Sequence, residues 1–260
     1  MAVKQTKKLS TVTTVTTVES NQKFPMTDTN GKVTLITLAN LKTALLDGVN
    51  LNTMYDGVFI MYHRKSDNFP LMVKPHKWTS LQNSGEIADG VAVVEGGKIL
   101  IVAPTEASTT LTWSSAAISG GGTTTGDRVT ALNDWEGKAN TASQVGKSTT
   151  SAVTNTASYA PGFCNLYSRA NANGKGLTAG KWWLPSLGEM MMIYANMTKI
   201  NYALSLITGA TQLQETAYWT STEGSAASAW GLTLSNGLAS YYGTKASTKL
   251  RVRAVSAFIS

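Results

Sequence analysis

The segment 90–104, GVAVVEGGKILIVAP, is the feature that most narrows the folds open to this chain. Two apolar runs, Val91–Val94 and Ile99–Val102, are joined across Glu95-Gly96-Gly97-Lys98. A Gly-Gly pair between two apolar runs is a strong signal for a tight β-hairpin. A further apolar run, Val58–Tyr62, is predicted to be a buried strand, and Pro70 and Pro75 restrict the residues after it to an edge strand or a loop.

The composition points in the same direction. Only 14% of the 260 residues are charged, against roughly 25% in an average globular protein, and the chain contains 23 glycines. An apolar content of 42% is enough to close a core and argues against intrinsic disorder. We therefore expect a β-rich protein with long turns rather than a helical bundle.

One helix is nevertheless predicted clearly. Ser186 is placed as an N-cap, and Glu189 three residues later completes a capping box. Beyond it, helical spacing puts several apolar side chains on one face, which we expect to fill the core: Leu187, Met190, Met191, Tyr194 and Met197.

Several classes of chemistry are disfavoured by residue counts. A single cysteine, Cys164, excludes an internal disulfide and a cysteine-rich zinc site, and His63 and His76 are too few for a histidine-based metal centre. We expect no metal and no cofactor. The net charge of +7 raises nucleic acid as a partner, but the basic residues are scattered, so we expect no nucleic-acid binding. No apolar run reaches the ~18–20 residues of a membrane-spanning helix, so no membrane insertion is expected.

Four motifs succeed one another from Trp182 to the C-terminal end of the chain. They are WWLPSLGEM (182–190), AYWTSTE (217–223), SAWGLTLSNG (228–237) and KLRVRAVSAF (249–258). The series resembles the C-type-lectin-like domain of formylglycine-generating-enzyme relatives and of the variable proteins of diversity-generating retroelements, which include phage tropism determinants. The resemblance implies an α+β fold of small antiparallel sheets with one or two helices. It also implies a scaffold made of Trp182, Trp183, Pro185, Trp219, Trp230, Arg251 and Arg253.

Two details of local structure are expected within these motifs. Asn236-Gly237 lies between LTL and LAS, which predicts a two-residue type I′ turn. Val252 and Ala254 alternate with Arg251 and Arg253, as in a half-buried terminal strand.

Between the anchor residues of these motifs, many positions from 224 to 249 show no period of 2 or 3.6 and are mostly small or polar, with a tyrosine pair. Antibody loops favour the same residues, since tyrosine gives contact area at low entropic cost and small residues leave the backbone open to hydrogen bonds. In the retroelement family, randomisation of template adenines yields such residues. The resemblance therefore implies a hypervariable face within 218–250, formed by Gly224, Ser225, Ala226, Ala227, Ser228, Gly231, Thr233, Leu238, Ser240, Tyr241, Tyr242, Gly243, Thr244, Ala246, Ser247 and Lys249.

The N-terminal part carries a second resemblance. DTNGKVTLITLANLKTALL (28–46) is similar to N-terminal segments of phage tail and head-fibre proteins, with a strand predicted at Lys32–Thr37 and a short helix through Leu38, Leu41, Ala44 and Leu45. We therefore expect three regions: 1–48 as a virion-anchoring or oligomerisation segment, 49–84 as a β-rich connector, and 85–260 as the display domain.

Together these features predict a non-enzymatic phage virion protein of the head or tail fibre, made in the host bacterial cytoplasm. It would bind a protein or glycan receptor on the host cell, with a homotrimer expected and a dimer as the alternative. Two other functions remain open. The chain could be a structural decoration of the virion without a receptor, or an enzyme of the formylglycine-generating type, although that chemistry relies on a cysteine pair and only Cys164 is present.

Overall fold

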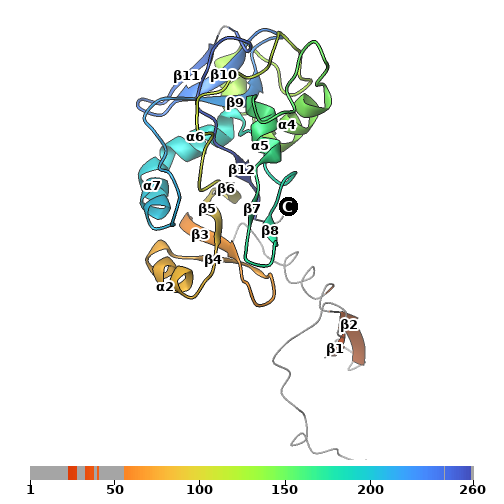
Figure 1. The fold of residues 1–260 in the computed structure, drawn as a ribbon, viewed down its shortest axis with the longest axis vertical. Helices are drawn as coiled ribbons and strands as arrows, with labels where there is room; N and C mark the ends of the chain where they lie inside the picture. The colour runs from red at the N-terminus through yellow and green to blue at the C-terminus, as the bar shows by residue number, and fades with distance from the viewer. Residues whose placement is uncertain (1–22, 28–32, 38–39, 41–55, 243, 259–260) are drawn as a thin grey trace, which may run out of the picture. The chain divides into compact units, whose positions relative to one another are not determined.

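The computed structural model describes residues 23–27, 33–37, 40, 56–242 and 244–258 of the chain (Figure 1). The chain divides into two compact units, Met1–Asn50 and Leu51–Ser260. In the first unit, β1 (Lys23–Thr27) and β2 (Val33–Thr37) form an antiparallel hairpin, which agrees with the predicted strand over 32–37. The helix predicted through Leu38 and Leu45 falls outside the described residues.

The second unit contains helices and antiparallel sheets, so the α+β class is confirmed. Its larger sheet has five strands in the order β12 (Val255–Ser256), β6 (Lys98–Val102), β5 (Ala88–Glu95), β3 (Gly57–His63) and β4 (Pro70–Val73). Side chains from both faces of the sheet are buried, because Val91 and Val93 enter one core cluster while Ala92 and Ile101 enter another. Burial on both faces explains why these strands are unbroken apolar runs rather than alternating ones.

The hairpin predicted at 90–104 is present. Glu95 faces Lys98 as the last pair of β5 and β6, and the two turn residues, Gly96 and Gly97, have φ values of +56° and +76°. Glycine adopts these left-handed values without the strain that a Cβ would cause. The prediction for Pro70 also agrees with the structure, since it begins β4, the strand at the edge of the sheet.

Residues 57–83, predicted from the sequence to lie in a connector, belong to the body of the second unit. They supply β3, β4, the 3-10 turn η3 (Pro75–Lys77) and helix α2 (Trp78–Asn83). Ile60 and Trp78 are fully buried in the core that also contains α6. The second compact unit therefore begins at Leu51 rather than near Gly85.

A smaller sheet of three strands lies at the opposite end of this unit from β4 and α2, at the top of Figure 1. Its order is β11 (Leu238–Tyr242), β10 (Ala229–Thr233) and β9 (Ala217–Glu223), all antiparallel. The remaining elements are α3 (Arg128–Leu132), α4 (Gly137–Gly146), α5 (Ala160–Leu166), β7 (Arg169–Ala170), β8 (Gly176–Leu177), α6 (Leu187–Ala195) and α7 (Met197–Ser205). Helix α6 packs on both sheets, against β9 and β10 on one side and β5 on the other.

The predicted two-residue type I′ turn at Asn236-Gly237 is wrong. Thr233 and Leu238 are the last facing pair, so four residues, 234–237, connect β10 to β11. Gly237 alone has a positive φ, +71°, and its N–H donates to the carbonyl oxygen of Thr233 at 2.8 Å. The loop is longer because Leu234 is buried in the core and its N–H donates to the carbonyl oxygen of Thr216.

The predicted half-buried terminal strand is also wrong. Only Val255–Ser256 forms a strand, and Arg253 is fully buried together with Val252 and Ala254. Its guanidinium donates to the carbonyl oxygens of Ala103 at 3.0 Å and Thr211 at 2.9 Å, and to the carboxylate of Glu106 at 3.2 Å. A buried arginine needs such partners, which alternation along the strand could not reveal.

Helix α6 begins as predicted. The hydroxyl of Ser186 accepts from the N–H of Glu189, and Oε2 of Glu189 accepts from the N–H of Ser186 at 2.8 Å. The helix ends at Ala195, and α7 starts after Asn196. Leu187 and Met190 are buried as expected, while Met191, Tyr194 and Met197 are half-buried, and Met192 and Ile193 complete the core.

Glu189, the second residue of this capping box, makes the stability of the fold depend on pH. Burial raises its pKa to about 7, although the N–H groups of Ser186 and Trp183 favour the ionised form. An unfolded glutamate titrates near 4.5, so between these values the folded state holds a proton that the unfolded state releases. We expect the stabilisation from this group to be complete below about pH 4.5 and lost as the pH rises through about 7, a change of about 3 kcal/mol.

The measurement is the free energy of unfolding by urea at about pH 5 and about pH 8, for the wild type and for Glu189→Gln. Glutamine can still accept from the N–H of Ser186 but does not titrate, so the wild type should lose more stability over this interval than the variant. Parallel pH profiles for the two proteins would show that Glu189 titrates normally.

No helix within the described ranges is both long and apolar enough to cross a lipid bilayer.

Candidate ligand-binding surface

The residues expected to form the variable face are mostly at the surface. Exposed are Ser225, Ala226, Ala227, Leu238, Tyr241, Thr244, Ala246, Ser247 and Lys249, and half-buried are Gly224, Thr233, Ser240 and Tyr242. Ser228 and Gly231 are buried, and Gly243 lies outside the described residues. Of the expected scaffold, Arg251 is half-buried and the others, Trp182, Trp183, Pro185, Trp219, Trp230 and Arg253, are buried.

These residues gather around β11, which among the described strands pairs only with β10 and so forms one edge of the small sheet. Tyr241 faces Trp230 across the two strands, and Tyr242 faces Ala229. Neighbouring residues on a strand point to opposite faces of a sheet. The two tyrosines therefore do not share one patch, and the expected face divides into two surfaces.

The first, which we call the strand surface, consists of Thr233, Leu238, Ser240 and Tyr242. The Tyr242 ring meets the edge of Trp219, with 5.9 Å between centroids, and its hydroxyl lies 3.2 Å from the Thr233 hydroxyl. Gly231 makes room for this ring, because a Cβ there would lie 2.9 Å from it and 2.8 Å from the carbonyl oxygen of Tyr218. Tyr242 is thus held in place, and Gly231 contributes space rather than contact.

The second, the loop surface, consists of Tyr241, the 224–228 loop and the 244–249 turn. Tyr241 lies against Trp230 with 5.1 Å between ring centroids and is 54% exposed. The 224–228 loop is closed by hydrogen bonds from the N–H groups of Ala227 and Ser228 to the Ser225 hydroxyl, at 3.1 and 3.2 Å. The N–H of Lys245 donates to the carbonyl oxygen of Ala227 at 2.8 Å, which joins the loop to the turn.

Lys245 anchors the loop surface from inside the molecule. Its side chain and that of Glu223 are both fully buried and form an ion pair of 2.5 Å. The ammonium also donates to the carbonyl oxygen of Ile118 at 2.8 Å and lies 4.2 Å from the Trp113 ring centroid. Burial lowers the Lys245 pKa, and the hydrogen bond and charge of Glu223 oppose that shift.

Neither Lys245 nor Glu223 was predicted from the sequence to have a role. The available signal was weak: Lys245 is the only charged residue between Glu223 and Lys249. Such isolation in a stretch of small residues could have marked it as structural, but its partner could not be identified from spacing.

Two reactive residue types, cysteine and histidine, also occur among the described residues away from these surfaces. Cys164 is fully buried, and burial raises the pKa of its thiol, so the nucleophilic thiolate is disfavoured. Nδ1 of His63 lies 2.7 Å from the carboxylate of Asp89. Across the described residues, no group of three or more His, Cys, Asp or Glu side chains is arranged to hold a metal ion.

The fold and the surface together define an α+β protein that presents small polar residues and two tyrosines around a sheet edge. Comparison with family models, curated proteins and solved structures found no match to this chain. The proposal for function therefore depends on the motifs and on the geometry of this surface.

Proposed function

We propose that this chain is a virion-attached receptor-binding protein of a bacteriophage, and that the strand and loop surfaces bind a molecule on the host cell. In this proposal the second unit is a C-type-lectin-like domain, as in the variable proteins of diversity-generating retroelements. The binding mechanism is recognition on a rigid support, without covalent chemistry.

One observation carries the proposal. Between 217 and 258, the motif residues are mostly sealed in the core while most of the residues between them are open to solvent. Trp219 and Trp230 are at most 2% exposed, and Tyr241, on the neighbouring strand, is 54% exposed. A buried frame that carries exposed small residues and tyrosine can change its contacts without losing its core, as antibody loops do.

The N-terminal unit has the complementary role in this proposal. It attaches the protein to the head or tail of the particle, and a homotrimer presents several copies of the surface. Multiple copies raise avidity by about 10²–10⁴ where the geometry allows simultaneous binding, so modest affinity at each site is sufficient.

Tyr241 offers the cleanest test of this function. We expect Tyr241→Ala to weaken binding of the purified protein to host cells by about 30-fold, the effect of losing an aromatic hot spot of about 2 kcal/mol. The free energy of unfolding should change by no more than about 1 kcal/mol, because the ring makes one aromatic contact and Tyr241 is 54% exposed. Binding is measured with labelled protein on whole cells, and stability by urea denaturation.

The matched control is Tyr202→Ala on α7, since Tyr202 is 55% exposed and belongs to neither surface. Binding should be unchanged in this variant. Tyr242→Phe tests the strand surface separately, because it removes the hydroxyl that meets Thr233 while keeping the ring against Trp219. Undiminished binding by both Tyr241→Ala and Tyr242→Phe would show that neither surface contacts the receptor. No binding of the wild type to host cells would favour a structural virion protein without a receptor.

A further inference from the structure

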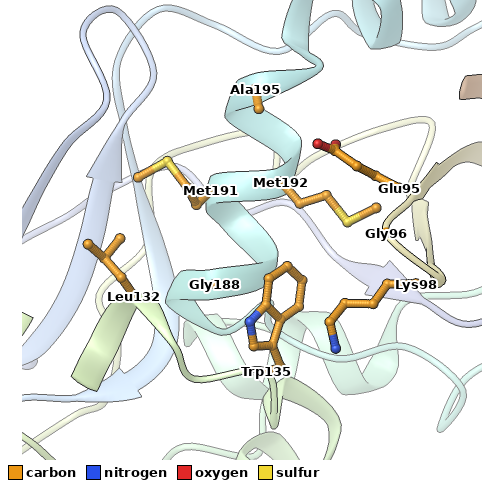
Figure 2. Close-up of a pocket in the computed structure, with 9 residues that line it drawn as sticks. All are labelled: Glu95, Gly96, Lys98, Leu132, Trp135, Gly188, Met191, Met192 and Ala195. Carbon is orange, nitrogen blue, oxygen red and sulfur yellow. The ribbon is translucent and has the colours of Figure 1, made fainter. Parts of the chain in front are cut away.

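A pocket of about 330 Å³ opens beside helix α6, away from the residues of the strand and loop surfaces (Figure 2). Its walls come from three distant parts of the chain: the β5–β6 turn, the segment 132–135 and α6 itself. The lining residues are Glu95, Gly96, Lys98, Leu132, Trp135, Gly188, Met191, Met192 and Ala195. This volume is at the lower end of the range for ligand pockets, about 300–1,000 Å³, and suits a small metabolite.

Gly188 brings these walls together. A Cβ at this position would lie 2.5 Å from the carbonyl oxygen of Asp134 and 3.0 Å from the Trp135 ring. Without a side chain there, the segment that carries Trp135 packs directly on the first turn of α6, and the N–H of Gly188 donates to the carbonyl oxygen of Asp134 at 3.0 Å. The indole of Trp135 is thereby placed at the end of the pocket, as Figure 2 shows.

Two opposite charges, both exposed to solvent, line the pocket. Glu95 and Lys98 face each other across the hairpin, where opposite charges commonly pair, yet among the ion pairs of the described residues none joins them. Oε2 of Glu95 accepts instead from Asn196 Nδ2 at 2.6 Å, and the Lys98 ammonium lies 4.5 Å from the Trp135 ring centroid. In Figure 2 a carboxylate and an ammonium stand on one wall, opposite Leu132 and Met191.

We propose that this pocket binds a free α-amino acid with an apolar or aromatic side chain. Its ammonium group would meet Glu95, its carboxylate would meet Lys98, and its side chain would pack among Leu132, Trp135 and Met191. Both charged side chains are exposed to solvent at the pocket, so a ligand with a single charge would engage only one of them. The zwitterion satisfies both charges at once.

Isothermal titration calorimetry on the full chain tests the proposal with three probes of similar size. L-phenylalanine carries both charges, phenylethylamine lacks the carboxylate, and phenylpropionate lacks the ammonium. We expect L-phenylalanine to bind up to about fivefold more tightly than either analogue, because an ion pair with an exposed side chain contributes about 0.2–1 kcal/mol.

Two variants assign the contacts. Lys98→Met should weaken L-phenylalanine by up to about fivefold and leave phenylethylamine unchanged, while Glu95→Gln should weaken L-phenylalanine and leave phenylpropionate unchanged. The control is Lys138→Met, which removes an ammonium 5.8 Å from the Trp183 ring and outside this pocket. The proposal is overturned if the folded wild type does not bind L-phenylalanine, or if it binds phenylpropionate or phenylethylamine equally well.

Discussion

Lys245→Met is expected to lower the free energy of unfolding by about 3–5 kcal/mol, the usual cost of leaving one charge of a buried ion pair alone. Methionine replaces the length of the lysine stem but cannot pair with Glu223, whose side chain is fully buried. The Gly120 N–H, which donates to Glu223 Oε2 at 2.9 Å, would be the closest remaining partner of the carboxylate. Urea denaturation at neutral pH measures the loss.

A second substitution shows whether the unpaired charge causes this loss. Adding Glu223→Gln to Lys245→Met removes the lone carboxylate, so the double variant should be more stable than Lys245→Met alone. Lys249→Met is the matched control, because Lys249 is at the surface four residues further on, and it should change stability by no more than about 0.5 kcal/mol. A loss below about 1 kcal/mol in Lys245→Met would mean that water reaches Glu223.

Glu106→Gln is expected to have an effect of the same size, about 3–5 kcal/mol. The Glu106 carboxylate accepts from Arg251, from Arg253 and from the Tyr218 hydroxyl, the last at 2.7 Å. Arg253 is fully buried, so a neutral partner at position 106 would leave its charge uncompensated. The midpoint of urea denaturation should fall accordingly.

Glu215→Gln controls for the loss of a negative charge from a protein that is already basic. Glu215 is exposed and forms none of the ion pairs found among the described residues, so its replacement should alter stability by at most about 0.5 kcal/mol. If Glu106→Gln changed the free energy of unfolding as little as this control, the ion pairs of Glu106 with Arg251 and Arg253 would not be a source of stability.

Features set by neighbours in sequence were predictable. The 95–98 hairpin turn and the capping box of Ser186 and Glu189 each depend on residues at most three positions apart, and both are present. The β-rich character of 57–102 could be predicted from unbroken apolar runs. These signals carry their structural meaning locally, so no knowledge of the remaining chain was needed.

Features set by distant partners were not predictable. Arg253 was expected on the open side of a strand because alternation shows a period but not Glu106, its partner 147 residues away. The turn after β10 was misjudged because burial of Leu234 outweighs the preference of Asn-Gly for a type I′ turn. The division of the expected face was missed because 238–242 has no clear hydrophobic period, so the sequence did not show that Tyr241 and Tyr242 point to opposite faces of a strand.

The opposite orientation of Tyr241 and Tyr242 restricts the shape of anything that touches both. Ala239, two residues before Tyr241 on the same face of β11, is buried in the core, so a partner can reach Tyr241 only at the end of the strand. A partner that contacts both tyrosines must therefore bend around the end of β11. Under the proposed receptor-binding function, the residues on one side could change while the tyrosine on the other side keeps its contact.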